Sequence, residues 1–295
     1  MTTRTSPSPT HTAAAQRPVA PLVRVAYFWP VLAFSIACAV PLYLLSGSTG
    51  DYFAWQTGSA LTAATLGAGY TAAVVMLSLT LLERDWVNAR ATLFAPAVLL
   101  GVMLVVTVLH WDEFPFGGAE TGSGAYAWFW LGVHLVAPVL ALVVWLRQRR
   151  EPGTDGPPQA PMGPDVSIPT SIMGVVLVGL AVPLWVAPES MADHWVWPVT
   201  PLDARALSAW LFTFGVASFQ AVWERDVRRL KAGFFTDVTL STLGLIALVR
   251  YSDDVRWGSV LTWVYLVTLV CLLVAGLTGR FLALPQALAH GRGHR

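Results

Sequence analysis

The stretch LLERDWVNAR at residues 81–90 interrupts a long apolar run with the charged triplet Glu83, Arg84 and Asp85. Three consecutive charged side chains are costly in hydrocarbon, so the triplet predicts the point where a membrane-spanning helix meets water. The stretch VWERDVRRLK at residues 222–231 repeats the triplet as Glu224, Arg225 and Asp226. This recurrence predicts that two parts of the chain share one architecture.

The composition around these stretches is that of a membrane protein. Of the 295 residues, 55% are hydrophobic and 12% are charged, and the mean hydropathy is +0.60, which is too apolar for a soluble domain. Windows of roughly 20 apolar residues, rich in Ala, Leu, Val and Gly, are typical of membrane helices rather than barrel strands. We predict an all-α polytopic membrane protein with eight transmembrane helices at residues 25–46, 57–82, 92–111, 126–147, 169–187, 204–223, 234–250 and 257–279.

The basic residues predict how the chain crosses the membrane. With the N-terminus placed in the cytoplasm, all of the 18 Lys and Arg residues except Arg205, Arg250 and Arg256 fall on cytoplasmic segments. Because basic residues near helix ends are retained in the cytoplasm, we expect both termini there. The excess of Arg over Lys, with abundant Ala, Gly and Pro, is typical of a GC-rich bacterial genome, so the expected location is the bacterial plasma membrane.

Four landmarks recur in the same order in two halves of the chain. VPLY at residues 40–43 and Trp55 match VPLW at residues 182–185 and Trp197, each 142 residues later, and the charged triplet and Asp112 match the second triplet and Asp253, each 141 residues later. Landmarks that recur in the same order predict an internal duplication. Because each copy has an even number of helices, both copies cross the membrane in the same orientation and form a parallel repeat. The predicted organisation is a disordered cytoplasmic tail (1–22), a first four-helix repeat (23–147), a flexible Pro- and Gly-rich cytoplasmic linker (148–168), a second four-helix repeat (169–280) and a cytoplasmic tail (281–295).

The two triplets are candidates for a gate at the inner face. One interpretation is structural: the carboxylates pair with nearby basic side chains, and the arginines reach lipid phosphates. The other is that two ionic clusters open when one four-helix unit rocks against the other. The candidate gate residues are Glu83, Arg84, Asp85, Glu224, Arg225 and Asp226.

Acidic and aromatic residues gather in the predicted outer loops. Tryptophan faces and carboxylates can bind a cation, a sugar or a lipid head group, which suggests an outer vestibule; the alternative is an anchoring belt of tryptophans. The candidate vestibule residues are Asp112, Asp253, Trp55, Trp111, Trp197 and Trp257. Asp112 and Asp253 are preferred because they recur and each is followed by a second acid.

Few polar side chains fall inside the predicted helices. Asp237 is the only acid clearly within one, and His134 lies about 12 Å below the outer end of its helix, too deep to pair with His110. We expect His134 to bond a polar group of another helix. The cysteines, Cys38 and Cys271, have no metal-binding spacing, and ATPase, hydrolase and dinucleotide-binding motifs are missing. No metal, cofactor or catalytic residue is predicted, and nucleic-acid binding has no basic patch to support it.

These features favour a secondary transporter or permease for a small or lipid-linked solute, with a ligand at its outer face. For this function we expect Asp112→Asn or Asp253→Asn to abolish uptake while the protein still inserts into the bilayer. The alternative is a non-catalytic scaffold or partner subunit of a membrane complex, which docks a protein through its outer loops or its linker. A lipid-modifying enzyme is a third possibility, although adjacent Asp112 and Glu113 suit two separate catalytic roles poorly.

Overall fold

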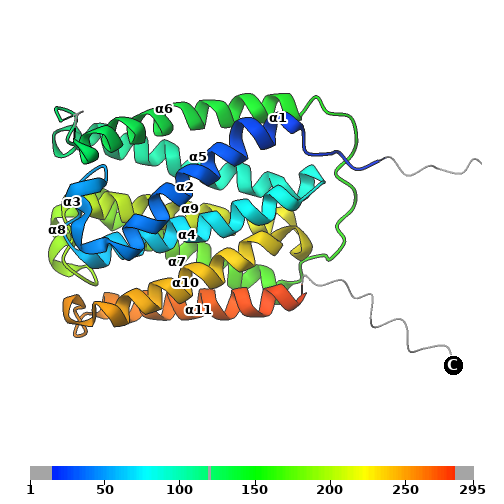
Figure 1. Cartoon of the computed structure of the whole chain (residues 1–295). Helices are drawn as coiled ribbons and strands as arrows, with labels where there is room; N and C mark the ends of the chain where they lie inside the picture. The colour runs from blue at the N-terminus through cyan, green and yellow to red at the C-terminus, as the bar shows by residue number, and fades with distance from the viewer. Residues whose placement is uncertain (1–14, 119–120, 283–295) are drawn as a thin grey trace, which may run out of the picture.

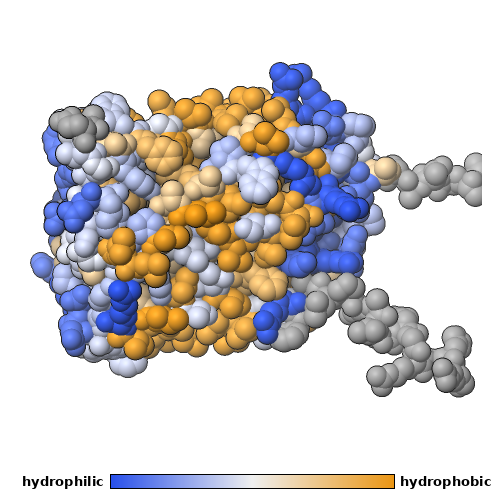
Figure 2. Space-filling model, viewed as in Figure 1, coloured by the Kyte–Doolittle hydropathy of each residue, from blue (hydrophilic) through white to orange (hydrophobic). Residues whose placement is uncertain are grey.

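The computed structural model describes residues 15–118 and 121–282, and these residues form a bundle of long helices without a named β-strand (Figure 1). Within these residues, eight helices are long and apolar enough to cross a membrane, which confirms the predicted class and number. Figure 2 shows apolar residues in a band around the middle of the visible face and hydrophilic residues toward both ends. This distribution matches the hydrocarbon core and the two aqueous boundaries of a bilayer.

The first spanning helix is a continuous run of α1 (Pro21–Val23), a π-helical turn (Arg24–Phe28) and α2 (Trp29–Leu44). The other seven long helices are α4 (Ala60–Leu82), α5 (Trp86–Leu109), α6 (Gly122–Gln148), α7 (Pro164–Val186), α9 (Pro201–Glu224), α10 (Lys231–Arg250, preceded by a 3₁₀ turn, Val227–Leu230) and α11 (Val260–Leu282). Short helices α3 (Thr49–Tyr52) and α8 (Pro188–His194) and the 3₁₀ turns Ser46–Ser48, Trp111–Glu113 and Ser252–Asp254 lie between them.

Some helices begin earlier than the apolar windows predict. The helix expected from residue 92 begins at Trp86, because Trp86, Ala89 and Leu93 bury one face of a helix that continues past Arg90. A hydropathy window registers the charge of Arg90, whereas in the helix this side chain lies at the edge of the buried face and bonds to Glu224 of α9. Helix bounds therefore follow the buried stripe.

The two ends of the bundle differ in character. The linker end comprises residues 15–20, 83–86, 149–163 and 224–231, and both ends of the described chain lie there (Figure 1). The aromatic end comprises residues 45–59, 110–118, 187–200 and 251–259. At the aromatic end, α5 and α10 each run into a three-residue 3₁₀ turn, and these turns carry Asp112 and Asp253.

The long helices group into two subbundles that mix the two halves of the sequence. In the first subbundle, α4 lies along α2 and α10, and α10 lies along α11. In the second subbundle, α9 lies along α7 and α5, and α5 lies along α6. By contrast, α4 contacts α5, its neighbour in sequence, only loosely. Two of these pairs, α4 with α10 and α5 with α9, join residues 23–147 to residues 169–280.

Glycines allow the closest approaches within the first subbundle. A Cβ atom at Gly67 of α4 would lie 2.6 Å from the backbone nitrogen of Tyr43 in α2. A Cβ atom at Gly276 of α11 would lie 2.6 Å from the carbonyl oxygen of Phe234 in α10. Such small residues strengthen helix contacts in a membrane, where the hydrophobic effect does not drive helices together.

Segments expected to be disordered or flexible have a defined course. Residues 15–20 lie beside the linker, where Arg17 N donates to Thr154 O (2.9 Å) and Thr154 N donates to Ala15 O (3.1 Å). The side chain of Gln148 accepts from Ala20 N and donates to Pro18 O, both at 2.8 Å. These bonds satisfy backbone groups that would otherwise need water. The remainder of the two predicted tails, residues 1–14 and 283–295, lies outside the described residues.

Candidate functional site

The first charged triplet binds the chain that enters the first spanning helix. Val19 N donates to Arg84 O and Trp86 N donates to Arg17 O, both at 2.9 Å, which makes an isolated antiparallel bridge between Pro18 and Asp85. The triplet is therefore extended backbone between two helices, and the carbonyl of Arg84 and the amide of Trp86 hold the incoming segment.

The second triplet repeats this arrangement with the chain that enters α7. Met162 N donates to Arg225 O (3.0 Å) and Val227 N donates to Ala160 O (2.9 Å), with the bridge between Pro161 and Asp226. The Asp226 carboxylate is buried and accepts from the backbone N–H groups of Gln159, Ala160 and Arg228 at 2.8–3.1 Å. Backbone binding gives the repeated triplet a structural role that the sequence interpretation did not include.

The most buried charge of the predicted gate, apart from Asp226, is Glu224, which is 3% exposed. Arg90 of α5 donates to both of its carboxylate oxygens, Nε to Oε1 at 2.6 Å and Nη2 to Oε2 at 2.5 Å. Arg90 also donates to Asp155 of the linker at 2.6 Å, and Arg229 approaches Glu224 at 3.5 Å. This cluster joins α5, α9, the linker and the turn before α10.

The two triplets have different bonding partners. Glu83 accepts from Asn88 (3.3 Å), and the side chains of Arg84 and Arg225 are exposed. Within residues 15–118 and 121–282, no ion pair joins one triplet to the other. Asp155 was not predicted, because the sequence around an acid in a linker does not indicate which distant residue it contacts.

Two of the predicted vestibule residues, Trp55 and Trp197, are buried at the aromatic end. The indole of Trp55, before α4, donates to Asp203 Oδ1 of α9 at 3.1 Å. The indole of Trp197, before α9, donates to Thr62 Oγ1 of α4 at 2.9 Å. Each tryptophan thus bonds the third residue of the helix that follows the other tryptophan, and both bonds cross from one subbundle to the other.

The same two tryptophans belong to matching aromatic triads. Phe53, Trp55 and Trp130 have ring centroids 4.7–5.4 Å apart. The rings of Trp195, Trp197 and Tyr265 lie 5.6–5.8 Å apart. Since such pairs contribute about 0.5–1.5 kcal/mol beyond burial, the triads stiffen the aromatic end on both sides.

Asp203 is the buried acid that the sequence analysis missed. It is 0% exposed, and its carboxylate accepts from Trp55 Nε1 and from Gly58 N (2.7 Å) while forming a capping box with Thr200. Its place at the predicted edge of a helix concealed it, but the sequence T-P-L-D at residues 200–203 is a recognisable helix start.

The other four vestibule candidates lie at the surface. Trp111 and Trp257 are each 43% exposed, and Asp112 and Asp253 are exposed on separate 3₁₀ turns. Asp112 follows α5 of the second subbundle, and Asp253 follows α10 of the first. In the described part of the chain, these acids share no hydrogen bond or ion pair.

We expect the double variant Asp112→Asn/Asp253→Asn to melt within about 2 °C of the parent protein, because exposed charges without partners contribute little to stability. Differential scanning fluorimetry in detergent measures this. Asp203→Asn serves as the buried comparison. A loss above about 5 °C in the exposed double variant would show that the two acids hold the turns in a way that their exposure does not suggest.

Two histidines have defined partners. His110 Nε2 accepts from Arg205 Nη1 and His110 Nδ1 donates to Glu113, both at 2.7 Å, which requires the neutral tautomer with the proton on Nδ1. His134 Nδ1 donates to Trp130 O of its own helix (2.7 Å), so the expected partner on another helix is wrong. A carbonyl four residues earlier lies within reach of a polar side chain on a helix.

A small cavity lies between the two subbundles, with a volume of about 40 Å³. Its walls come from α4, α10 and α11 of the first subbundle, from α7 and α9 of the second, and from Trp195. Thr65 and Thr268 are its only hydroxyl residues besides Tyr265, and no charged side chain lines it. The described residues contain no group of three His, Cys, Asp or Glu side chains suited to a metal ion.

Comparison of the chain with protein family models, curated proteins and solved structures finds no match.

Proposed function

We propose that this multi-pass membrane protein is a permease in which the two subbundles separate alternately at the aromatic end and at the linker end. The observation that carries the proposal is the cavity at the interface of the subbundles, with bonds between them toward both ends. A carrier in its occluded state requires this combination of an internal site and two closures.

The closures differ in chemistry. At the aromatic end, the crossed bonds of Trp55 with Asp203 and of Trp197 with Thr62 join the subbundles. At the linker end, Gln148 of α6 bonds the segment before α1, and Arg229 before α10 approaches Glu224 of α9. The hydrogen bonds of each closure are few and each is worth about 1 kcal/mol, so substrate binding has enough energy to shift the balance between the two closures.

Matching elements in the two halves support an internal duplication as the origin of the subbundles. If each helix is replaced by its counterpart in the other half of the sequence, the pair α4 and α10 becomes the pair α9 and α5. The same replacement converts the first subbundle into the second. The paired tryptophan bonds and the paired bridges at the triplets follow the same replacement. We propose a parallel repeat, with the basic linker end in the cytoplasm of a bacterial cell.

Alternation can be tested without a known substrate. In a variant with Cys38→Ala and Cys271→Ser, spin labels at Asp112→Cys and Asp253→Cys report on the aromatic end. Labels at Leu82→Cys and Trp223→Cys, both exposed at the ends of α4 and α9, report on the linker end. We expect pulsed electron spin resonance in liposomes to give two distances at each end, since each end opens in one of two states.

A disulfide provides the control. A Cβ atom at Gly58 would lie 2.7 Å from Thr200 Cγ2, so Gly58→Cys/Thr200→Cys can link the subbundles at the aromatic end. Oxidation of this pair should remove the longer distance between the aromatic-end labels, and reduction should restore it. A single distance at both ends, unchanged by oxidation, would contradict alternation.

A partner subunit without transport activity is the second candidate. It is favoured by the exposed aromatic surface of Trp111 and Trp257, which lie on or just after the two 3₁₀ turns of the aromatic end. Aromatic residues of this kind are enriched at protein interfaces. Rigid distances in the spin-label experiment, together with a protein that purifies with the chain and is lost in Trp111→Ser/Trp257→Ser, would support this function.

A further inference from the structure

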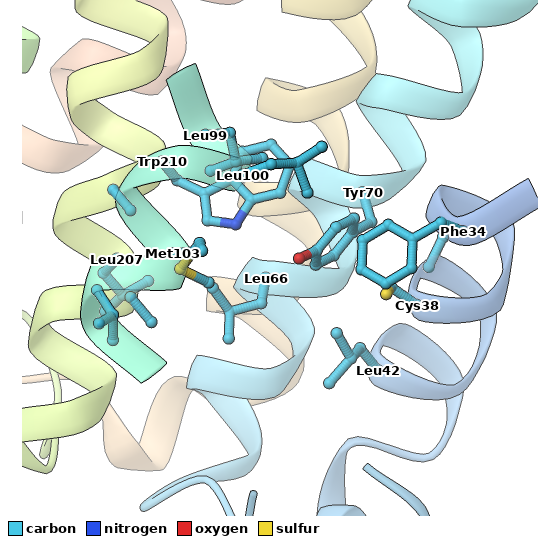
Figure 3. Close-up of a cluster of buried hydrophobic side chains, with 14 of the residues drawn as sticks. Phe34, Cys38, Leu42, Leu66, Tyr70, Leu99, Leu100, Met103, Leu207 and Trp210 are labelled. Carbon is cyan, nitrogen blue, oxygen red and sulfur yellow. The ribbon is translucent and has the colours of Figure 1, made fainter. Parts of the chain in front are cut away.

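The cavity between the subbundles has two buried hydrogen-bond donors in its wall. Trp195 is 1% exposed and Trp210 is 7% exposed, and neither indole N–H has a partner within the described residues. Figure 3 shows the nitrogen of Trp210 on the side of the ring toward Met103 and Leu66, of which Leu66 also lines the cavity. Because a buried unpaired donor costs about 1–3 kcal/mol, such a pair in one wall points to an absent acceptor.

The matching space on the other side of the interface is filled. There Phe34 lies against Tyr70, Trp130 and His134 with ring centroids 5.5–5.9 Å apart. The residues 142 after Phe34 and 141 after Tyr70 are Val176 and Leu211, which are smaller. Leu211 lines the cavity, so at this position the second half of the chain has lost an aromatic ring beside the open volume.

The bilayer is the natural source of a ligand for this space. The flanking helices α7 and α11 both contribute to the cavity wall and do not pack along each other, and we infer that a molecule from the bilayer enters between them. The lining carries no charge, and an ion would lose its hydration without compensation. An apolar chain suits the lining, and the volume of about 40 Å³ holds a short part of such a chain.

We propose that this cavity binds a membrane-soluble molecule whose apolar chain carries a carbonyl oxygen, with Trp195 or Trp210 donating to that oxygen. Two molecules of the bilayer have this chemistry, an ester-linked lipid and an isoprenoid quinone. The proposal rests on the proposed function in taking the interface between the subbundles as the substrate path. Binding itself requires no transport, so the two can fail separately.

Photolabelling of the purified full chain in detergent tests the site. The probe is a diacyl glycerophospholipid with a diazirine on one acyl chain, and labelled peptides are mapped by mass spectrometry. We expect saturable labelling of residues 207–214 and 265–272, displaced by an ester lipid or by a quinone but not by the ether-linked analogue, which has no carbonyl. The more potent competitor identifies the source of the ligand.

Trp→Phe variants distinguish the contribution of the indole N–H to binding from that of aromatic packing. Trp195→Phe/Trp210→Phe should lower labelling of these segments at least about fivefold, which corresponds to one hydrogen bond. Trp29→Phe, on a lipid-facing tryptophan that is 57% exposed, should leave it unchanged. Equal displacement by ether and ester lipids, or labelling spread evenly over the lipid-facing helices, would overturn the proposal. Saturable labelling in a protein with rigid spin-label distances would retain the site and reject the permease.

Discussion

Replacement of Arg90 by methionine is expected to lower the free energy of unfolding by about 3 kcal/mol. The substitution keeps much of the apolar stem but leaves the buried Glu224 carboxylate without its two strongest hydrogen bonds. Removal of one partner from a buried ion pair costs about 3–5 kcal/mol, because the other charge stays desolvated. Arg229, 3.5 Å from Glu224, reduces this cost. Reversible unfolding in mixed detergent micelles measures the difference.

Two further variants distinguish the effect of breaking the Arg90–Glu224 ion pair from the effect of removing any positive charge. Arg84→Met removes an exposed arginine from the first triplet and should change stability by less than about 0.5 kcal/mol. The double variant Arg90→Met/Glu224→Met should recover part of the loss, since it no longer buries an unpaired charge. If Arg90→Met and the double variant are equally destabilised, the unpaired carboxylate is not the cause.

The sequence predicts the helices well because burial in lipid is a local property. Each span needs about 20 apolar residues and satisfies its own backbone bonds, so a window of composition finds it. The charged triplets mark the ends of α4 and α9 for the same reason. Local signals cannot give the partners of each helix, and hydropathy does not predict that α4 packs along α10.

The candidate site was less predictable because repeated residues do not all have exposed roles. Trp55 and Trp197 recur as parts of the joint between subbundles, whereas Asp112 and Asp253 recur as exposed residues of matching 3₁₀ turns. The sequence could not separate these cases, since a tryptophan near the membrane surface suits an anchor, a ligand site and a buried joint equally. Burial and bond partners decide between them.

Replacement of Asp203 by alanine is expected to destabilise the protein by about 4 kcal/mol and to populate the state that is open at the aromatic end. The substitution leaves the Trp55 indole and the backbone N–H groups of Gly58 and Thr200 without their acceptor in a buried site. Each unpaired donor costs about 1–3 kcal/mol, and loss of the capping box adds to the sum. Unfolding in micelles gives the stability, and the spin-label pair at Asp112 and Asp253 gives the populations.

Thr62→Ala is the matched control, because Thr62 occupies the corresponding position in α4 and accepts the indole N–H of Trp197. Its loss should cost about 1 kcal/mol, the value of one hydrogen bond. The two tryptophan bonds are thus unequal in strength. The acceptor of Trp55 is the Asp203 carboxylate, which also binds other donors, whereas the acceptor of Trp197 is the single hydroxyl of Thr62. If the two alanine variants lose the same stability and neither changes the aromatic-end distances, the crossed tryptophan bonds do not hold the subbundles together. Closure would then come from the aromatic triads and from the bonds of Arg256 to Ala192, Trp195 and Val196, and Trp130→Leu would test the share of the triads.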